Sequence, residues 1–129
     1  MPRYLSDEWI DELDAAAQAH PSLVTATQDV DLVIQQEVTG GPDGDVAFHV
    51  AVDHGSVRFR SGRAPEADVT FTQDHGTAVA VGTGELSAQT AFMIGKLRIT
   101  GDVEALMRHM DAFDGVEDVF ESVRASTAY

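Results

Sequence analysis

The chain has 129 residues, a mass of 13.8 kDa and a hydrophobic content of 43%, which is enough for one domain with a proper core. Its 22 acidic residues against 8 basic ones give a formal net charge of −14, which argues against binding to nucleic acids and to anionic membranes because both repel negative charge. Cysteine is absent, so disulfide bonds and thiol catalysis are excluded.

Neither membrane insertion nor export is expected. No apolar run approaches the roughly 18 residues that cross a bilayer, and the first residues lead into acidic Asp7 and Glu8, unlike the basic and then apolar order of a signal peptide. We therefore predict a cytoplasmic protein. Lys96 is the only lysine, and this bias, with abundant Asp, Ala, Val and Gly, suits a GC-rich or salt-tolerant bacterial or archaeal source.

The first predicted element is an amphipathic helix that follows Ser6 and has ended by Pro21. Ser6 can cap its first turn, where Asp7 and Glu8 interact favourably with the helix dipole. Apolar residues recur at a spacing near 3.6, which predicts one buried face. These residues are Leu5, Trp9, Leu13, Ala16 and Ala17.

The apolar period then changes to two, which predicts four consecutive strands separated by turns at 40–44, 53–56 and 62–67. Because these connections are short, we expect the four strands to form an antiparallel meander. Gln36 breaks the alternation. The apolar residues that share one side are Val30, Leu32, Ile34 and Val38, then Val46, Phe48, Val50 and Val52, then Val57 and Phe59, and last Val69 and Phe71.

Helical spacing returns after Asp74, a predicted N-cap, in a short helix over 77–81 that stops at the glycines of 82–84. A second short helix is capped by Ser87. It precedes a fifth strand over 96–100, in which apolar and basic residues alternate.

Two further helices complete the predicted order. Asp102 caps the first, and the second follows Gly115. Their apolar stripes are Val103, Leu106, Met107, Met110 and Phe113 in the first and Val116, Val119, Phe120 and Val123 in the second. The whole order predicts an α+β fold: a five-stranded, mostly antiparallel sheet, made of the four-strand meander and the late strand, with helices packed on one face.

The sequence contains no clear pattern of catalytic or metal-binding residues. None of the five histidines stands at a spacing such as His-x3-His, which would place two ligands on one face. Neither a Gly-x-Ser-x-Gly elbow nor a complete phosphate loop occurs. We therefore expect no metal, no cofactor and no catalytic activity. In a small enzyme acting on hydrophobic substrates, Asp68, Asp74 and His75 would be the candidate residues.

The last third of the chain is rich in flexible apolar side chains. It contains Met93, Met107 and Met110, three of the four methionines. Unbranched thioether side chains suit surfaces that repack around variable partners. From composition alone, however, an ordinary core is the favoured interpretation.

Two segments of the sequence resemble the sterol-carrier-protein-type-two (SCP-2) family. The first is Asp-Val-Thr-Phe-Thr at 68–72, and the second is Ala-Phe-Met-Ile-Gly-Lys-Leu-Arg-Ile-Thr-Gly-Asp at 91–102. The second is the more specific, because it combines Phe-Met before Gly-Lys, an alternating strand, and Gly-Asp at the start of the next helix. The resemblance covers residues 28–113, and the length and the late helices agree over the whole chain.

Members of that family have a five-stranded sheet with helices that together enclose an apolar tunnel for sterols, fatty acids or fatty acyl-CoA, and they perform no chemistry on the ligand. The resemblance therefore implies one lipid-binding domain over 1–129 that carries a hydrophobic small molecule. The residues implied for the tunnel wall are Phe92, Met93, Leu97, Ile99, Leu106, Met107, Met110 and Phe113.

Two features depart from the family, and one alternative function stays open. The chain ends in Ser-Thr-Ala-Tyr and not in a peroxisomal Ser-Lys-Leu signal, and its acidity is unlike that of the basic lipid-transfer members. In the alternative, Phe48, Phe59 and Phe71 fill the tunnel, and the domain serves for homodimerisation or as an accessory to a partner enzyme. A large apolar void would favour a carrier, and a packed core beside an exposed apolar patch would favour an interaction module.

Overall fold

The computed structural model describes residues 2–42 and 44–129. It confirms the predicted α+β class and the five predicted strands. Asp43, in the predicted turn at 40–44, lies outside the described residues. In chain order the elements are α1 (Asp7–Gln18), α2 (Pro21–Ala26), β1 (Asp31–Gly41), β2 (Gly44–Asp53), β3 (Ser56–Ser61), β4 (Val69–Asp74), α3 (His75–Thr83), α4 (Ala88–Met93), β5 (Leu97–Gly101), α5 (Val103–Arg108) and α6 (Met110–Arg124).

Side-chain caps begin four of these helices, as the sequence predicts. Ser6, Asp74, Ser87 and Asp102 each accept a hydrogen bond from the backbone N–H three residues further on. Each bond satisfies one of the donors that a helix N-terminus leaves without a partner. The starts of α1, α3, α4 and α5 are therefore determined locally.

Helix α2 is absent from the sequence prediction, in which Pro21 only marks the end of α1. Pro21 instead occupies the first turn of α2, where the missing N–H of proline costs nothing. The His20 imidazole accepts a hydrogen bond from the Leu23 amide at 3.1 Å and caps this helix. Proline thus both ends one helix and begins the next.

The predicted boundary between the last two helices is wrong. Helix α5 ends at Arg108 and not near Phe113, and α6 runs from Met110 through Gly115 without a break. A Cβ atom at position 115 would lie 2.8 Å from Cδ1 of Leu23, so the glycine lets α2 pack closely against α6. Gly115 therefore serves packing between two helices and does not end one.

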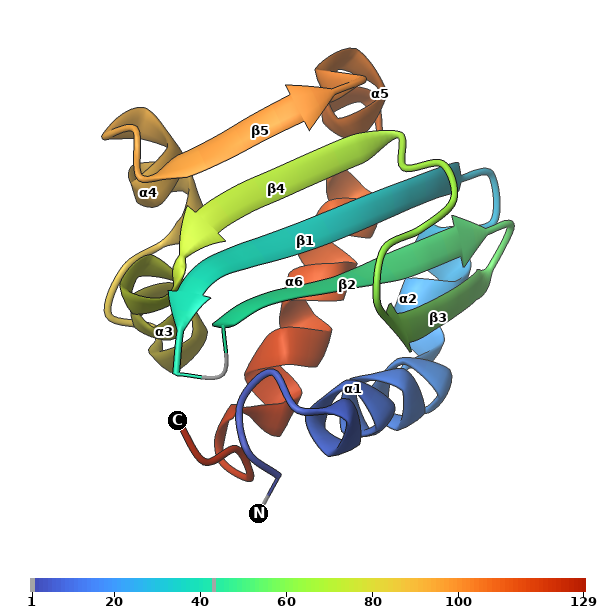
Figure 1. The fold of residues 1–129 in the computed structure, drawn as a ribbon. Coiled ribbons are helices and arrows are strands. Elements are labelled where there is room, and N and C mark those ends of the chain that lie inside the picture. Colours follow the sequence, from blue (N-terminus) through green and yellow to red (C-terminus); the bar gives the residue numbers. More distant parts are fainter. Residues whose placement is uncertain (1, 43) are drawn as a thin grey trace.

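The five strands form one sheet in the order β3-β2-β1-β4-β5 (Figure 1). The first three strands form an antiparallel meander as predicted, and β5 pairs antiparallel with β4. The predicted place of the fourth strand is wrong, because β4 pairs in parallel with β1 and leaves β3 at the edge. The sheet is therefore mixed, although three of its four pairings are antiparallel.

The segment 62–68 carries the chain back across the sheet on the face opposite α6 (Figure 1). It binds side chains of β1 on the way. The Ala64 amide donates to Oε1 of Gln35 at 3.0 Å, and the Arg63 guanidinium pairs with the Glu37 carboxylate at 2.6 Å. These contacts place β4 beside β1, and they leave the other face of the sheet free for the helices.

Helix α1 occupies the free edge of β3, which explains why β4 pairs elsewhere. The Asp14 carboxylate accepts hydrogen bonds from the Phe59 amide at 2.9 Å and from Nε and Nη2 of Arg58 at 3.0 and 3.1 Å. The Gln18 side chain donates to the Val57 carbonyl at 2.6 Å. These side chains satisfy backbone groups that an edge strand otherwise exposes, so a further strand has nothing to pair with there.

The helices cover one face of the sheet, as predicted, and α6 runs behind the strands in Figure 1. Strand residues alternate between the two faces, and the helix-facing ones are mostly apolar and buried. Among the described residues, no helix combines the length and the apolarity that crossing a membrane requires. The largest side chains in the core are Trp9, Ile10, Leu13, Leu23, Leu32, Ile34, Phe48, Phe59, Phe71, Leu97 and Leu106.

Replacing Asp14 by alanine should lower the free energy of unfolding by about 2 kcal/mol at neutral pH, because a carboxylate only 17% exposed loses three hydrogen bonds. Burial alone would raise the pKa of Asp14, but hydrogen bonds from Arg58 and Phe59 and the charges of Arg58 and Arg60 hold it below its ordinary value of 3.8. The stabilisation is therefore present above about pH 4 and is lost as the pH falls through the lowered pKa.

Urea denaturation of wild type and Asp14→Ala, followed by circular dichroism at neutral pH and near pH 3, tests this expectation. Asp11→Ala, at an exposed position of the same helix, is the matched control and should change stability by less than about 0.5 kcal/mol. An equal difference between wild type and Asp14→Ala at both pH values would contradict the prediction.

Candidate functional site

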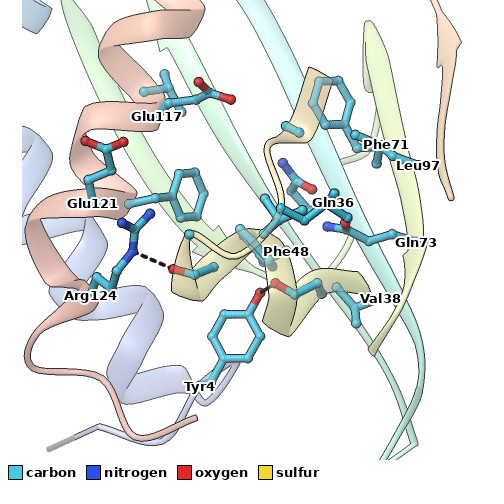
Figure 2. A pocket seen from close by; sticks show the side chains of 18 of the residues that line it. Tyr4, Gln36, Val38, Phe48, Phe71, Gln73, Leu97, Glu117, Glu121 and Arg124 are labelled. Atoms are coloured by element: carbon cyan, nitrogen blue, oxygen red, sulfur yellow. Dashed lines mark hydrogen bonds between the residues drawn. The ribbon is translucent and has the colours of Figure 1, made fainter. Parts of the chain in front are cut away.

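A cavity of about 330 Å³ lies between the helix-facing side of the sheet and α6, and we call it the inner cavity. Its floor consists of side chains from β1, β2, β4 and β5, and its opposite wall is α6. Figure 2 shows Gln36, Val38 and Gln73 on the strand side and Glu117, Glu121 and Arg124 along the helix. The connection between α3 and α4 closes a third side, and the remaining lining residues are mostly apolar.

Aromatic side chains hold α6 away from the sheet at two places. The ring of Phe113 lies 5.6 Å from that of Phe71, and the ring of Phe120 lies 5.7 Å from that of Phe59 and 6.4 Å from that of Phe48. The two helix positions are seven residues apart, which is about 10 Å along the axis. The smaller Val116 lies between them, so the space next to it is not filled and the inner cavity remains.

The two ends of the chain close one end of the cavity. The rings of Tyr4 and Tyr129 lie 4.8 Å apart, and their hydroxyls donate to the carbonyls of Ala78 and Gly82 at 3.1 and 2.9 Å. Burial raises the pKa of Tyr4 well above its ordinary value, and the neighbouring Tyr129 raises it further. Both phenols are therefore neutral donors that fix the chain ends to α3.

The rim on α6 is acidic. The pKa of Glu117 is raised by burial and then by the carboxylates of Asp114, Glu121 and Asp118. Arg124 is the single cation among the described lining residues, and its Nε donates to the Gly82 carbonyl at 2.7 Å. The rim therefore has more negative than positive charge, which disfavours an anionic ligand.

Two buried polar atoms of the cavity lining have no hydrogen-bond partner in the described chain: Nε1 of Trp9 and Oε1 of Gln73. Native proteins leave few such atoms unsatisfied, and each calls for a physical explanation. Here both belong to residues that line the inner cavity.

The residues predicted for the tunnel wall are divided between the cavity and the surface. Leu97 and Phe113 line the inner cavity, whereas Leu106 is buried and Ile99 half-buried outside its lining. The remaining four are exposed: Phe92 by 49%, Met93 by 77%, Met107 by 68% and Met110 by 45%. A role of the eight residues in ligand binding stays a prediction.

Sequence reasoning missed several residues that line the cavity. Gln36 and Gln73 occupy positions of β1 and β4 that share the helix-facing side with Ile34 and Phe71. A polar residue in the apolar phase of an alternating strand was the signal that could have identified them. Trp9 and Phe120 were expected to be buried, but nothing in the sequence indicates that they border an empty volume.

The three candidate catalytic residues have structural partners or lie away from the cavity. The Asp68 carboxylate accepts the Val33 amide at 2.7 Å, and the Asp74 carboxylate accepts the Thr77 amide at 2.7 Å as the cap of α3. Neither these two nor His75 belongs to the lining of the inner cavity. The described part of the chain also contains no group of three histidine or acidic side chains that could hold a metal ion.

Comparison with known proteins gives one family and several similar folds. Residues 10–114 match the SCP-2 sterol transfer family. A crystal structure of sterol carrier protein 2 is similar with a TM-score of 0.76 and 21% identity, covering 92% of this chain and 97% of that chain. No match was found among curated proteins.

Two structures determined in solution are also similar. A conserved hypothetical protein of Thermus thermophilus, described as possibly a sterol carrier protein, has a TM-score of 0.77 and 22% identity over 95% of this chain and 91% of that chain. Palmitated SCP2L2 from Aedes aegypti has a TM-score of 0.64 and 21% identity over 88% of this chain and 94% of that chain. At these identities the similarity shows a shared fold.

Replacing Glu117 by glutamine should raise the free energy of unfolding at neutral pH by less than about 1 kcal/mol, because it removes the cost of burying the charge and then the repulsion from neighbouring carboxylates, at a half-exposed position. The folded state binds the Glu117 proton more tightly than the unfolded chain does. Wild-type stability therefore falls as the pH rises from the ordinary pKa of 4.5 through the raised one, and the gain from the substitution disappears below about pH 4.

Thermal or urea unfolding of Glu117→Gln across this pH range provides the measurement. Glu66→Gln, which removes the same charge from an exposed loop, is the control. A Glu117→Gln protein that is less stable than wild type at neutral pH, or equally altered near pH 3, would be incompatible with this interpretation.

Proposed function

The chain belongs to the SCP-2 sterol transfer family, and from this premise we propose that it binds a hydrophobic, lipid-like ligand in the inner cavity without catalysing a reaction on it. Membership of the family and the shared fold support lipid or sterol binding or transfer in general, on a fold that is generally non-catalytic. The observation that carries the proposal is the cavity of about 330 Å³, which is lined mainly by apolar side chains between the sheet and α6.

The energetics of apolar burial support the proposal. Each methylene group that leaves water contributes about 0.8 kcal/mol, so ten of them contribute roughly 8 kcal/mol before the loss of ligand freedom is subtracted. Val50 and Val116 face the empty cavity and lack van der Waals contacts on that side. A bound ligand would supply these contacts. Micromolar affinity with broad selectivity follows without a charged anchor.

Sterols, fatty acids and fatty acyl-CoA are the proposed ligand classes. The name of the family supports a sterol, and the similar palmitated SCP2L2 supports an acyl chain. Glu117 and Glu121 belong to the cavity lining, and their carboxylates weigh against the phosphates of an acyl-CoA and, less strongly, against the single charge of an ionised fatty acid. A continuous tunnel, a cytoplasmic location and a bacterial or archaeal source stay predictions.

One observation favours the alternative, an interaction module. Large apolar side chains are exposed near the end of α4 and where α5 meets α6, and an exposed apolar patch is typical of a protein interface. The inner cavity supports the carrier over a filled core, so we place homodimerisation or an accessory role second. The exposed residues are Phe92, Met93, Ile94, Met107 and Met110.

Filling the cavity should abolish ligand uptake. Val116 lies between the two aromatic contacts of α6, and Val116→Trp places a large ring in the empty volume. Titration with diphenylhexatriene, an uncharged fluorophore that emits in apolar surroundings, should show saturable binding to wild type and at least about tenfold weaker binding to this variant.

Val24→Trp is the matched control, because Val24 is exposed on α2 and does not line the cavity. It should bind the probe like wild type, and circular dichroism of both variants verifies that they are folded. A wild-type protein that takes up no probe, or a Val116→Trp protein that binds it undiminished, would refute the proposal that this cavity is the ligand site.

A further inference from the structure

The exposed residues of the cavity lining lie around one opening. They are Gly84 and Ser87 in the connection between α3 and α4, Glu121 on α6, and Tyr129. The other lining residues that the structure describes are buried or half-buried. The inner cavity therefore reaches the surface between the α3–α4 connection on one side and the last turns of α6 with Tyr129 on the other. We call this opening the mouth.

Two side chains from the C-terminal side of the mouth donate to one carbonyl on the opposite side. Nε of Arg124 donates to the Gly82 carbonyl at 2.7 Å (Figure 2), and the Tyr129 hydroxyl donates to the same oxygen at 2.9 Å. Within the described residues, no other hydrogen bond joins 82–87 to α6 or to the residues that follow it. The Gly82 carbonyl is therefore the point at which hydrogen bonds hold the two sides of the mouth together.

The end of α3 is suited to these two donors. The last carbonyls of a helix have no partner within it and carry the negative end of its dipole, which favours a cation. Gly84 ends α3 in the left-handed conformation, at a φ of 85°. A Cβ atom at Gly84 would lie 3.0 Å from Nη1 of Arg124, and one at Gly82 would lie 2.9 Å from Cε1 of Tyr129. The two glycines thus let the guanidinium and the phenol lie directly against the end of the helix.

The α3–α4 connection itself has few contacts with the rest of the molecule. Gly84, Glu85 and Ser87 are exposed, and Leu86 packs against the core only in part. The Leu86 amide donates to the Ala80 carbonyl at 3.1 Å, which ties the connection to α3 and not to α6. Segments with few buried apolar contacts open at the lowest cost in free energy. The connection is therefore the side of the mouth that can move.

We propose that Arg124 is a latch across the mouth: the α3–α4 connection moves away from α6 to admit or release a ligand, and this opening breaks the bond between Arg124 and the Gly82 carbonyl. The inference rests on the proposed function and adds the route of ligand exchange and its control. A hydrogen bond from a charged group favours the closed state, so its loss raises the open fraction. Because a ligand enters and leaves through the same opening, both rates rise together and affinity changes little.

The release of diphenylhexatriene from the loaded protein tests the latch. Trp9, the only tryptophan, lines the cavity, so energy transfer from its ring to the probe reports bound probe. Loaded protein is mixed rapidly with an excess of phosphatidylcholine vesicles, and the recovery of tryptophan emission gives the release rate constant. A separate titration gives Kd, and the two values together give the association rate constant.

Arg124→Met keeps an unbranched apolar stem and removes the donor. We expect it to raise the release rate constant about tenfold and to change Kd by less than about twofold. Tyr129→Phe removes the second donor and keeps the ring, and it should raise the release rate constant about threefold. Arg108→Met is the matched control, because Arg108 is exposed on α5 and does not line the cavity, and it should release the probe like wild type. Circular dichroism verifies that all variants are folded.

The outcomes separate this inference from the function on which it rests. If wild type fails to bind diphenylhexatriene, the proposed function itself is overturned. If the probe binds and its release rate constant changes less than about twofold in both Arg124→Met and Tyr129→Phe, the latch is overturned and the proposed function stands. Faster release with an equal rise in Kd would also overturn the latch, because association would then be unchanged and a lost contact with the ligand would explain the result.

Discussion

The aromatic contacts between α6 and the sheet are the constraint on which the inner cavity depends. Protein interiors are normally packed as densely as organic crystals, and an empty volume costs stability unless the surrounding structure cannot collapse into it. Phe113 against Phe71, and Phe120 against Phe48 and Phe59, hold the two layers apart at positions two helical turns from each other. The cavity is therefore a consequence of large side chains at its ends and a small one, Val116, between them.

The mixed sheet makes this arrangement possible. Helix α1 satisfies the outer edge of β3 through Asp14 and Gln18, so the chain returns across the opposite face and places β4 beside β1. Gln35 and Glu37 hold that returning segment. The helix-facing side of β1 and β4 is thereby left free for α6 and for the inner cavity. The parallel register is also what brings Gln36 and Gln73 to the same floor.

The distribution of polarity around the cavity is consistent with an uncharged ligand. Carboxamides are the polar groups of the floor, carboxylates dominate the α6 rim, and the tyrosine hydroxyls at one end are engaged by α3 carbonyls. The whole molecule also has an excess of negative charge, with a formal net charge of −14. Long-range attraction to anionic surfaces is therefore not expected.

Features that depend on neighbours in the sequence could be read from it, and features that depend on distant partners could not. The caps at Ser6, Asp74, Ser87 and Asp102 and the alternating strands are set by residues a few positions apart, which is why the α+β class was predictable. The family was recognised from the resemblance of the contiguous segments 68–72 and 91–102. The strand that pairs with β4 could not be predicted in this way. It depends on α1, which contacts β3 through Asp14 and Arg58, two residues 44 positions apart in the sequence. Apolar periodicity distinguishes the buried side of an element from its exposed side. It does not tell whether the buried side faces packed atoms or an empty volume, so the residues of the cavity wall could be identified only from the tertiary structure.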